Sequence, residues 1–525
     1  FVSNKFINYT NIFMKNLKLQ LAIFSAVLFF SACSKDEGGE KGGGGGGEAV
    51  RTTELKITPE TVSTGYMGNG VEYGLYEHCF DANSDWGKAF GMWMDEAMWE
   101  KTFKRLDYMK LSLARTMITS KSFCYTGNDN GGNPVIDNTR NLAVAEKWLD
   151  YCDSRDVTLL WGEWGTGTIA SVTDPKWSRT VIGYADYLIN TRGHDCIRYF
   201  IPTNEPDGNW SDATGGNFLT WKQAAENVFD EIDSRGLGDR LQIAGPDACP
   251  GITGPTFIAM AATQLKEKIG LWNIHIYPYP SDIRNGNYES MIRQWRGIMG
   301  TDKKLVLGEL GIKYQPGTEE YAENIRRAQE DPMGKTDATG SSNMFVYDFS
   351  YAIDIADLYI QCMRGGISGA CAWMVCDAMN TSAGQKMKRW GMWNIFGTKM
   401  GNVADEDIRP WFYTLSLLSR YIPEGSDILT VNASGVAGVR AVAARKEGEI
   451  TLAVVNNSGK DQRIRFSMEG EHSRTMQVFH CMENDRPADS DQLPVPKETR
   501  EVNLASGEEF DLPASSFILL TSHNF

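Results

Sequence analysis

The segment IRYFIPTNEPDGNW, Ile197–Trp210, combines an apolar run with a glutamate near its end. The apolar run predicts a short buried strand. Pro206 ends that strand because proline has no N–H to give to a β-ladder. Glu205 is therefore expected at the carboxyl end of a strand, at the rim of a pocket, with the loop after it turning away toward Trp210.

Short apolar runs alternate with longer amphipathic stretches between about residues 71 and 421, which is the pattern of repeated βα units around a parallel sheet. Eight runs predict strands: VEYGLYE (71–77), LSLARTMIT (111–119), VTLLWGEW (157–164), IRYFIPTNE (197–205), LQIAGPD (241–247), LWNIHIYPY (271–279), KLVLGELG (304–311) and GISGACAWMV (366–375). Eight such strands predict an α/β fold, a closed (β/α)₈ (TIM) barrel over residues 71–422. The stretch 95–109 has the apolar spacing of a helix in the outer ring. An open doubly wound sheet is the competing fold, but GLYEHCF (74–80) is not the Gly-rich turn typical of it.

The alternation of predicted strands and helices ends at residue 426. VAGVRAVAARKEGEITLAVVNNSGKDQRIRFSM (436–468) and SSFILLTS (515–522) are strands separated by turn residues, with no helical stretch between them. We therefore expect a small antiparallel β-sandwich domain over 426–525. The segment 53–66, which contains ELKITPETVSTG, is expected to add a further strand to it.

The first residues have the pattern of an export signal. MKNLKLQLAIFSAVLFFSAC, Met14–Cys33, has two lysines, an apolar stretch too short for a permanent membrane anchor, and small residues before the cysteine. It resembles a bacterial lipoprotein signal, which implies lipidation of Cys33. Residues 1–13 are interpreted as upstream sequence and 34–52 as a flexible Gly-rich tether. We therefore expect a secreted lipoprotein, held at the outer membrane or cell surface of a Gram-negative bacterium, with the periplasmic face as an alternative.

Composition narrows the kinds of partner. The chain has 525 residues and a formal charge of −15, and no cluster of Lys and Arg suggests binding to nucleic acid. Fifteen Trp and twenty Tyr offer flat faces that suit sugar rings. Of the ten cysteines, the nine other than Cys33 show no CxxC spacing, and those at 362, 371 and 376 lie in apolar runs typical of inert buried thiols. We expect no metal site, no cofactor and a monomer.

A second glutamate ends a predicted strand in the same way. Glu309 lies in KLVLGELGIKY, between Gly308 and Gly311, which leave space around it. Glu205 and Glu309 are three βα units apart, so they are expected to face each other across the barrel mouth. Two facing carboxyl groups are what glycosidic cleavage needs, one protonated and one ionised. A separation of roughly 5 to 5.5 Å would predict retention of configuration.

Other strand-end residues fit the same chemistry. Arg115 is a permanent cation suited to keeping Glu309 ionised, whereas Glu205 needs an apolar or anionic neighbourhood to hold a proton. His275 and Tyr277 are two residues apart in a strand and therefore face the same way. Two of these candidates also have a purely structural interpretation: Glu309 could be an ion-pair partner at a strand end, and His275 could be a core residue.

The motifs TNEP, GEL and HIY, with Arg115 and Trp373, resemble the active site of the clan A glycoside hydrolases, retaining (β/α)₈ enzymes that include families 5, 30 and 39. The resemblance implies the following roles: Glu205 as acid/base, Glu309 as nucleophile, Asn204 as a ligand of the sugar 2-hydroxyl, His275 and Tyr277 as the residues that position the carboxylates, Arg115 as support of the nucleophile, and Trp373 as the platform under the sugar ring. Trp373 could equally belong to the barrel core.

The third predicted strand departs from family 5, which usually has a histidine there. This chain reads LLWGEWGTG (159–167), and the C-terminal sandwich favours families 30 and 39. Glu163 is a candidate third carboxylate, and Trp161 or Trp164 is a candidate platform for a neighbouring sugar. Trp210, after Glu205, is a further candidate for substrate binding or support.

The sequence thus predicts a surface-tethered retaining glycosidase that acts on a β-linked polysaccharide or oligosaccharide. A transglycosylase would use the same residues with a sugar hydroxyl as acceptor. A catalytically inactive glycan-binding lipoprotein is a third possibility, although a binding protein has no need of both Glu205 and Glu309. A metal hydrolase would need clustered His and Asp at the strand ends, where only His275 is evident.

Overall fold

The computed structural model describes residues 52–75, 93–165, 169–332, 334–380, 386–434 and 436–525. The predicted export signal, Cys33 and the Gly-rich tether lie outside these residues, as do the last two residues of the first predicted strand. Within the described ranges, no helix combines the length and the apolar character needed to cross a membrane.

Eight parallel strands close into a barrel in the order in which they occur in the chain. They are β2 (Asn69–Glu72), β3 (Leu113–Ile118), β6 (Thr158–Glu163), β7 (Ile197–Ile201), β8 (Gln242–Ala248), β9 (Ile269–Ile276), β10 (Leu305–Leu310) and β11 (Gly369–Ala372). Every predicted barrel strand is present, and β11 pairs with β2 to close the ring. The (β/α)₈ barrel is therefore confirmed.

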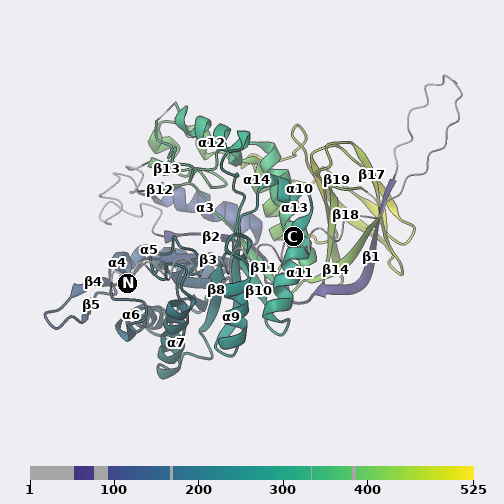
Figure 1. The fold of residues 1–525 in the computed structure, drawn as a ribbon. Helices are drawn as coiled ribbons and strands as arrows, with labels where there is room; N and C mark the ends of the chain where they lie inside the picture. The colour runs from purple at the N-terminus through teal and green to yellow at the C-terminus, as the bar shows by residue number, and fades with distance from the viewer. Residues whose placement is uncertain (1–51, 76–92, 166–168, 333, 381–385, 435) are drawn as a thin grey trace, which may run out of the picture. The chain divides into compact units, whose positions relative to one another are not determined.

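Helices surround the barrel strands (Figure 1). The longer ones are α3 (Glu96–Met109), α5 (Leu142–Ser154), α6 (Pro175–Asp186), α7 (Phe218–Ser234), α9 (Thr256–Gln264), α11 (Asn287–Met299), α12 (Glu319–Gln329), α13 (Phe349–Gly365) and α14 (Pro410–Tyr421), and the short ones are α4 (Ser120–Phe123), α8 (Pro250–Thr253) and α10 (Pro280–Arg284). The predicted helix at 95–109 is α3. Its N-cap residue, Asp95, accepts a hydrogen bond from the backbone N–H of Met98 at 3.0 Å.

Alternate residues of the barrel strands belong to two separate apolar clusters. Leu113 and Met117 of β3 and Leu160 of β6 lie in a small cluster made by barrel strands. Ala114 and Trp161, the neighbours of Leu113 and Leu160, lie in the large cluster shared with the helices. Side chains therefore alternate between barrel interior and helical layer, as the period of two in a strand requires.

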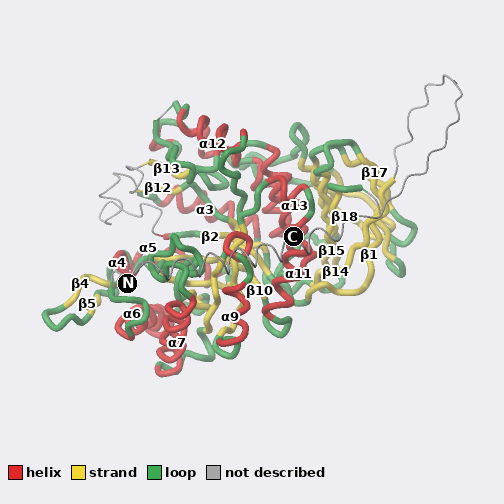
Figure 2. Tube along the Cα trace, in the orientation of Figure 1, coloured by secondary structure: helices red, strands yellow, loops and turns green. Residues whose placement is uncertain are grey.

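The C-terminal part is a separate nine-stranded sheet with its own apolar core. Its order is β19-β18-β21-β16-β15-β14-β1-β17-β20, formed by β1 (Thr52–Ser63), β14 (Asp427–Ser434), β15 (Val439–Lys446), β16 (Glu449–Asn456), β17 (Gln462–Met468), β18 (Ser473–Cys481), β19 (Glu498–Asn503), β20 (Glu508–Leu512) and β21 (Ser516–Thr521). Figure 2 shows these strands in yellow, joined by green loops. The sheet is mostly antiparallel as predicted, except that β1 runs parallel to β17.

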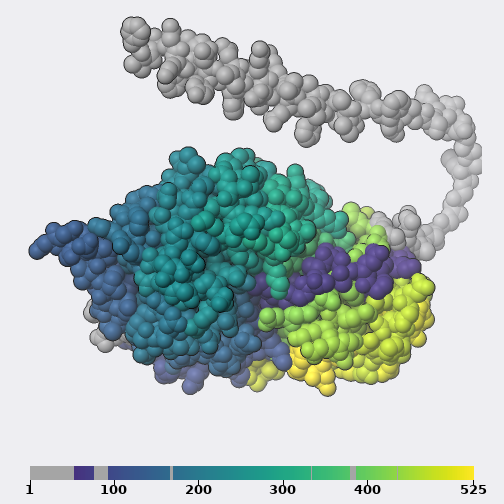
Figure 3. Space-filling view, turned by 90° about the horizontal axis from the view of Figure 1, so that it is seen from below, coloured from purple at the N-terminus to yellow at the C-terminus, as the bar shows by residue number. Residues whose placement is uncertain are grey.

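The N-terminal strand β1 joins this sheet although the whole barrel separates them in the sequence. It pairs with β14 on one side and β17 on the other. In Figure 3 the purple residues of β1 lie against the green and yellow residues of the C-terminal strands. Helix α13 contacts the sheet through ion pairs and hydrogen bonds, including Arg440 Nη1 with Asp357 Oδ2 at 2.6 Å. Both ends of the described chain are thereby fixed to the barrel.

Loops at the carboxyl ends of the barrel strands are longer than elsewhere. Strand β3 is followed by α4 and the hairpin of β4 (Tyr125–Asn128) and β5 (Pro134–Ile136), and β11 by the hairpin of β12 (Ala378–Asn380) and β13 (Lys386–Lys388). The insertion after β10 contains α12. These loops surround the end of the barrel at which Glu205 and Glu309 lie.

Candidate active site

Glu205 and Glu309 line one pocket of about 930 Å³, a size that accommodates more than one sugar ring. Glu205 follows β7, and Glu309 lies at the end of β10. Glu205 has a φ of 42° and Asp247, at the end of β8, a φ of 62°. Both values fall in the left-handed region, which non-glycine residues seldom adopt and which clusters at functional sites.

One ring nitrogen of His275 lies between the two carboxylates. Its Nδ1 is 3.2 Å from Oε1 of Glu205 and 3.6 Å from Oε2 of Glu309. The two oxygens therefore cannot be farther apart than the sum of these distances. That limit excludes most of the range of roughly 6.5 to 9.5 Å found in inverting glycosidases and includes the roughly 5 to 5.5 Å of retaining ones.

Arg115 is completely buried and its guanidinium has four side-chain partners. Nη1 donates to Glu309 Oε1 at 2.7 Å and to Glu72 Oε2 at 3.0 Å. Nη2 donates to Asp247 Oδ2 and to Asn204 Oδ1, both at 2.8 Å. Arg115 therefore contacts Glu309 as expected, and it also fixes Asp247 and Glu72, two carboxylates that were not predicted.

Replacing Arg115 by methionine is expected to lower the free energy of unfolding by about 3–5 kcal/mol, because it leaves buried carboxylates without their cation. Urea denaturation at neutral pH measures the effect. Arg155→Met is the control, since its pair with Asp107 is about four-tenths exposed on both sides and is worth about 0–1 kcal/mol. The loss in free energy of unfolding caused by Arg115→Met should become smaller as the pH falls, because the carboxylates left unpaired become protonated. Equal losses in the two variants would contradict this role of Arg115.

His275 bridges the acidic groups of the site. Nε2 is 2.9 Å from Asp247 Oδ1, and Nδ1 faces Glu205. Burial alone would lower the pKa of His275, but the carboxylates of Asp247 and Glu309 outweigh burial and raise it well above its usual value. Both ring nitrogens of His275 therefore face carboxylate oxygens, an arrangement that favours the charged form of the ring.

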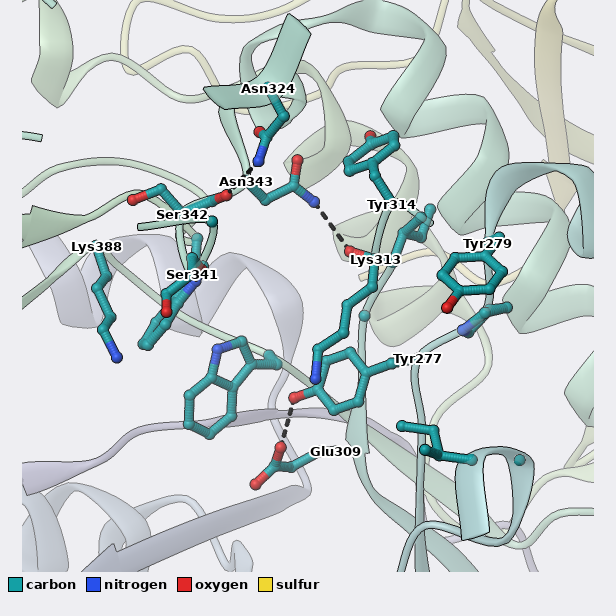
Figure 4. Close-up of a pocket in the computed structure, with 18 of the residues that line it drawn as sticks. Tyr277, Tyr279, Glu309, Lys313, Tyr314, Asn324, Ser341, Ser342, Asn343 and Lys388 are labelled. Carbon is teal, nitrogen blue, oxygen red and sulfur yellow. Dashed lines mark hydrogen bonds between the residues drawn. The ribbon is translucent and has the colours of Figure 1, made fainter. Parts of the chain in front are cut away.

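Tyr277 extends from the same strand as His275 and donates its hydroxyl to Glu309 Oε2 (Figure 4). Burial, followed by the charges of Glu309 and Glu205, raises the pKa of Tyr277 well above its usual value, so the phenol stays a donor. Gly311 is required here: a Cβ at this position would lie 2.9 Å from Cε1 of Tyr277. Both oxygens of Glu309 thus have a donor, Arg115 for one and Tyr277 for the other.

The surroundings of Glu205 differ from the prediction. Burial alone would raise its pKa, but the hydrogen bond and charge of His275, with the charge of Lys313, lower it to about 2. Trp210 Nε1 donates to its Oε2 at 2.6 Å and Cys249 Sγ to its Oε1 at 3.1 Å. The expected apolar or anionic neighbourhood is therefore wrong, because cations and hydrogen-bond donors surround this carboxylate.

Replacing Lys313 by glutamine is expected to shift the alkaline limb of the kcat/KM profile to higher pH. Removing the cation favours the protonated form of Glu205 and so strengthens the binding of the proton that Glu205 and His275 hold between them, which lets the acid form of the site persist to higher pH. A shift of about half a unit is expected, since Lys313 is solvent-exposed and its charge is screened. Lys399→Gln, outside the pocket, should leave the limb in place. A downward shift for Lys313→Gln would contradict this electrostatic role.

Aromatic side chains line much of the pocket. Trp373 does so from the residue after β11, with Trp390 at 5.2 Å between ring centroids. Trp164 also lines it. Trp210 is 47% exposed and holds Glu205 through its indole N–H. Three of these four tryptophans were predicted, and Trp390 was not.

Two residues of the third strand do not reach the pocket. Trp161 is buried in the helix-side core near Tyr184. Glu163 is buried and accepts hydrogen bonds from the N–H and the hydroxyl of Ser120, at 2.9 and 2.6 Å. Burial raises its pKa to about 7. The candidate roles of Trp161 and Glu163 in sugar binding are therefore wrong: with Leu160 in the barrel interior, alternation directs 161 and 163 toward the helices.

The insertion after β10 forms one wall of the pocket. Asn324 of α12 donates to the carbonyl of Ser342 at 2.7 Å, and Asn343 donates to the carbonyl of Ile312 at 3.1 Å, as Figure 4 shows. Lys313 from the same insertion points at Tyr277, with its ammonium 4.2 Å from the ring centroid. The predicted strands do not place these side chains, because all of them lie in the insertion that follows β10.

Sequence reasoning missed two site residues, Asp247 and Cys249, although their positions in the sequence could have identified them. Asp247 is the last residue of the predicted strand LQIAGPD and Cys249 follows it by two residues, at the end where the barrel presents its site. Asp247 contacts Arg115 and His275, and Cys249 contacts Glu205. A strand-end aspartate was therefore a candidate on the same grounds as Glu205.

No protein-family model and no curated protein matches the chain. Solved structures share its architecture. The catalytic domain of the family 30 xylanase C from Talaromyces cellulolyticus is 13% identical, covers 90% of this chain and 100% of its own, and has a TM-score of 0.61. The fold is thus one found in glycoside hydrolases. A family 39 β-xylosidase from Caulobacter crescentus (11% identity, 90% and 100% coverage, TM-score 0.55) and a family 51 α-L-arabinofuranosidase from Bifidobacterium longum (13%, 90% and 100%, 0.56) also match.

Proposed function

We propose that this protein is a retaining glycoside hydrolase that cleaves a β-linked glycan through a covalent glycosyl-enzyme. The observation that carries the proposal is the placement of Glu205 and Glu309 on either side of one nitrogen of His275, within the pocket. The similar solved structures are a xylanase, a β-xylosidase and an α-L-arabinofuranosidase, all of which act on glycosidic bonds. They support the reaction class and leave sugar and linkage to experiment.

The first step joins the sugar to Glu309. A carboxylate oxygen of Glu309 attacks the anomeric carbon while the carboxyl of Glu205 gives its proton to the glycosidic oxygen, so the bond to the leaving group breaks. In the second step a water molecule attacks the same carbon. Glu205 takes the proton of that water, the bond to Glu309 breaks, and two inversions leave the configuration retained.

His275 supplies the proton that Glu205 lacks before substrate binds. The pair holds one proton, and it lies on the imidazole because Glu205 has a low pKa. Nδ1 of His275 is 3.2 Å from Oε1 of Glu205, within reach of direct transfer. Transfer leaves a neutral His275 and a protonated Glu205 with no change in the total charge. The apparent pKa of the acid therefore belongs to the pair.

The two donors on Glu309 serve its role as nucleophile. Arg115 and Tyr277 hold one oxygen each, which fixes the carboxylate plane and leaves its remaining lone pairs toward the pocket. Asn204, whose oxygen accepts from Arg115, lines the pocket and has its amide N–H groups available for a sugar hydroxyl. Trp373 is proposed as the platform under the sugar that is attacked.

We also propose the location expected from the sequence, attachment to the outer membrane through lipidated Cys33.

The proposal is tested by assaying the protein against β-glucans, xylans, mannans and galactans and sizing the products. Release of reducing sugar from at least one substrate, absent in Glu309→Gln, is the expected result. Oligosaccharides longer than the substrate would instead indicate the transglycosylase, and glycan binding with no turnover the inactive binding protein. Turnover that survives in Glu309→Gln would contradict the proposal.

A further inference from the structure

A thiol, an imidazole and a carboxylate converge beside the proposed nucleophile. Cys249 Sγ is 3.1 Å and His275 Nδ1 is 3.2 Å from the same oxygen, Oε1 of Glu205. The three donor atoms all lie within 4.8 Å of one another. They come from the ends of three neighbouring parts of the barrel, β8, β9 and the loop after β7, so no CxxC or HxxxH spacing announces them in the sequence.

The spacing of the donors suits a tetrahedral zinc ion. Zn–S bonds of about 2.3 Å and Zn–N and Zn–O bonds of about 2.0–2.2 Å place tetrahedral ligands about 3.3–3.6 Å apart. The separations of 3.1 and 3.2 Å from Oε1 of Glu205 need widening by a few tenths of an ångström, and the third pair, Cys249 Sγ and His275 Nδ1, lies within 4.8 Å. The side chain of Glu205 is 14% exposed in the pocket, so an ion in solution can approach the cluster.

The residues behind the cluster are those a zinc ligand needs. A ligating histidine usually donates its other N–H to a carboxylate, and Nε2 of His275 is 2.9 Å from Asp247 Oδ1. Asp247 is itself held by Arg115 at 2.8 Å and by Asn273 Nδ2 at 2.6 Å. Oε2 of Glu309 is 3.6 Å from Nδ1 of His275, so the proposed nucleophile lies beside the cluster.

The ligand types select the metal. A thiolate with an imidazole favours zinc over the hard cations magnesium and calcium, which prefer oxygen ligands only. Four carboxylates, those of Glu72, Glu205, Asp247 and Glu309, lie around Arg115 and His275.

We propose that Glu205, Cys249 and His275 bind one Zn²⁺ ion reversibly and that the bound ion blocks catalysis. The blocking effect rests on the proposed function, because the ion occupies the oxygen of Glu205 that must carry the catalytic proton. Binding releases the thiol proton of Cys249 and the Nδ1 proton of His275, and no electrons are exchanged. Zinc and a productive substrate complex are therefore mutually exclusive.

Binding is tested on the full chain, freed of metal by chelation, with Zn²⁺ in calorimetry and with Co²⁺ as a spectroscopic substitute. The expected result is a thiolate-to-cobalt charge-transfer band that Zn²⁺ displaces. Cys249→Ser should lose the band and bind Zn²⁺ at this site at least about 10–100-fold more weakly. Cys196→Ser is the matched control, because Cys196 is also buried but directly precedes β7, at the end of the barrel away from the pocket. This variant should keep the cobalt band and the affinity for Zn²⁺.

A thiolate band that persists in Cys249→Ser, or no band in the wild-type protein, would overturn the site. Should Cys249→Ser fail to fold, Cys249→Ala and the wild-type cobalt spectrum carry the same test. The second arm measures turnover of the best substrate from the glycan assay. Zn²⁺ should inhibit it, EDTA should restore it, and Cys249→Ser should need at least about tenfold more Zn²⁺ for half inhibition.

The two arms separate the failure of this inference from the failure of the proposed function. Zinc binding with no glycosidase activity on any glycan would support the zinc site and refute the proposed glycosidase function. Glycosidase activity that Zn²⁺ does not inhibit would refute the inference alone. Activity that requires Zn²⁺ would refute both.

Discussion

A Glu309→Ala variant is expected to lose turnover by a factor on the order of 10⁵ or more on its best substrate, the size seen when a nucleophile is removed. The protein should still fold, because Glu309 lies at the pocket surface and its removal leaves Arg115 with Asp247 and Glu72. Initial rates with a substrate that has a good leaving group measure the loss. Azide added to the variant should form a glycosyl azide of configuration opposite to that of the substrate.

The control for this variant is Glu330→Ala, which removes an exposed glutamate of an ion pair with Arg326. It should keep normal rates. Near-normal rates in Glu309→Ala, or a glycosyl azide of the same configuration as the substrate, would show that another group attacks the anomeric carbon.

A Glu205→Ala variant should show losses that depend on the leaving group. Substrates with a poor leaving group, such as a sugar, need the proton and should slow by about 10²–10⁴-fold. An activated aryl glycoside needs little protonation and should form the glycosyl-enzyme at near-normal rate. Its hydrolysis should then stall for want of a base, giving a burst of aryl alcohol in pre-steady-state measurements.

Azide distinguishes this variant from the first. It needs no general base, so it should accelerate turnover of Glu205→Ala and yield a glycosyl azide of retained configuration. Trp210→Phe, which removes one donor to Glu205 and keeps an aromatic ring, should show no burst. Equal losses on both kinds of substrate would contradict the role of Glu205 as acid/base.

The barrel could be predicted from the sequence because its strands are apolar runs separated by amphipathic stretches. The strand ends then placed Glu205, Glu309, Arg115, His275 and Tyr277 at one rim by topology alone. Closure of the ring brings the strand ends together: Arg115, His275 and Glu309 lie in strands, and Tyr277 and Glu205 follow the ends of β9 and β7.

The alternation of side chains along the third strand could have predicted which of its residues reach the pocket. With Leu160 in the barrel, residues 162 and 164 also face inward and 161 and 163 face the helices. Trp164 was therefore the better candidate of the two tryptophans, and Glu163 a residue of the outer layer.

The charge environment of Glu205 could not be predicted. It depends on Lys313, which lies in an insertion that no predicted strand places, and on Asp247, whose charge raises the pKa of His275. A pKa reflects the sum of burial, charges and hydrogen bonds within a few ångströms, and sequence spacing gives none of these distances.

The stereochemistry of the first product decides between retention and inversion, because it depends on whether Glu205 and Glu309 act in turn on one anomeric carbon. Proton NMR during the first minutes of hydrolysis of the best substrate identifies the anomer released before mutarotation. A retaining mechanism releases the β-anomer from a β-linked substrate, and this is the expected result. Release of the α-anomer first would contradict it.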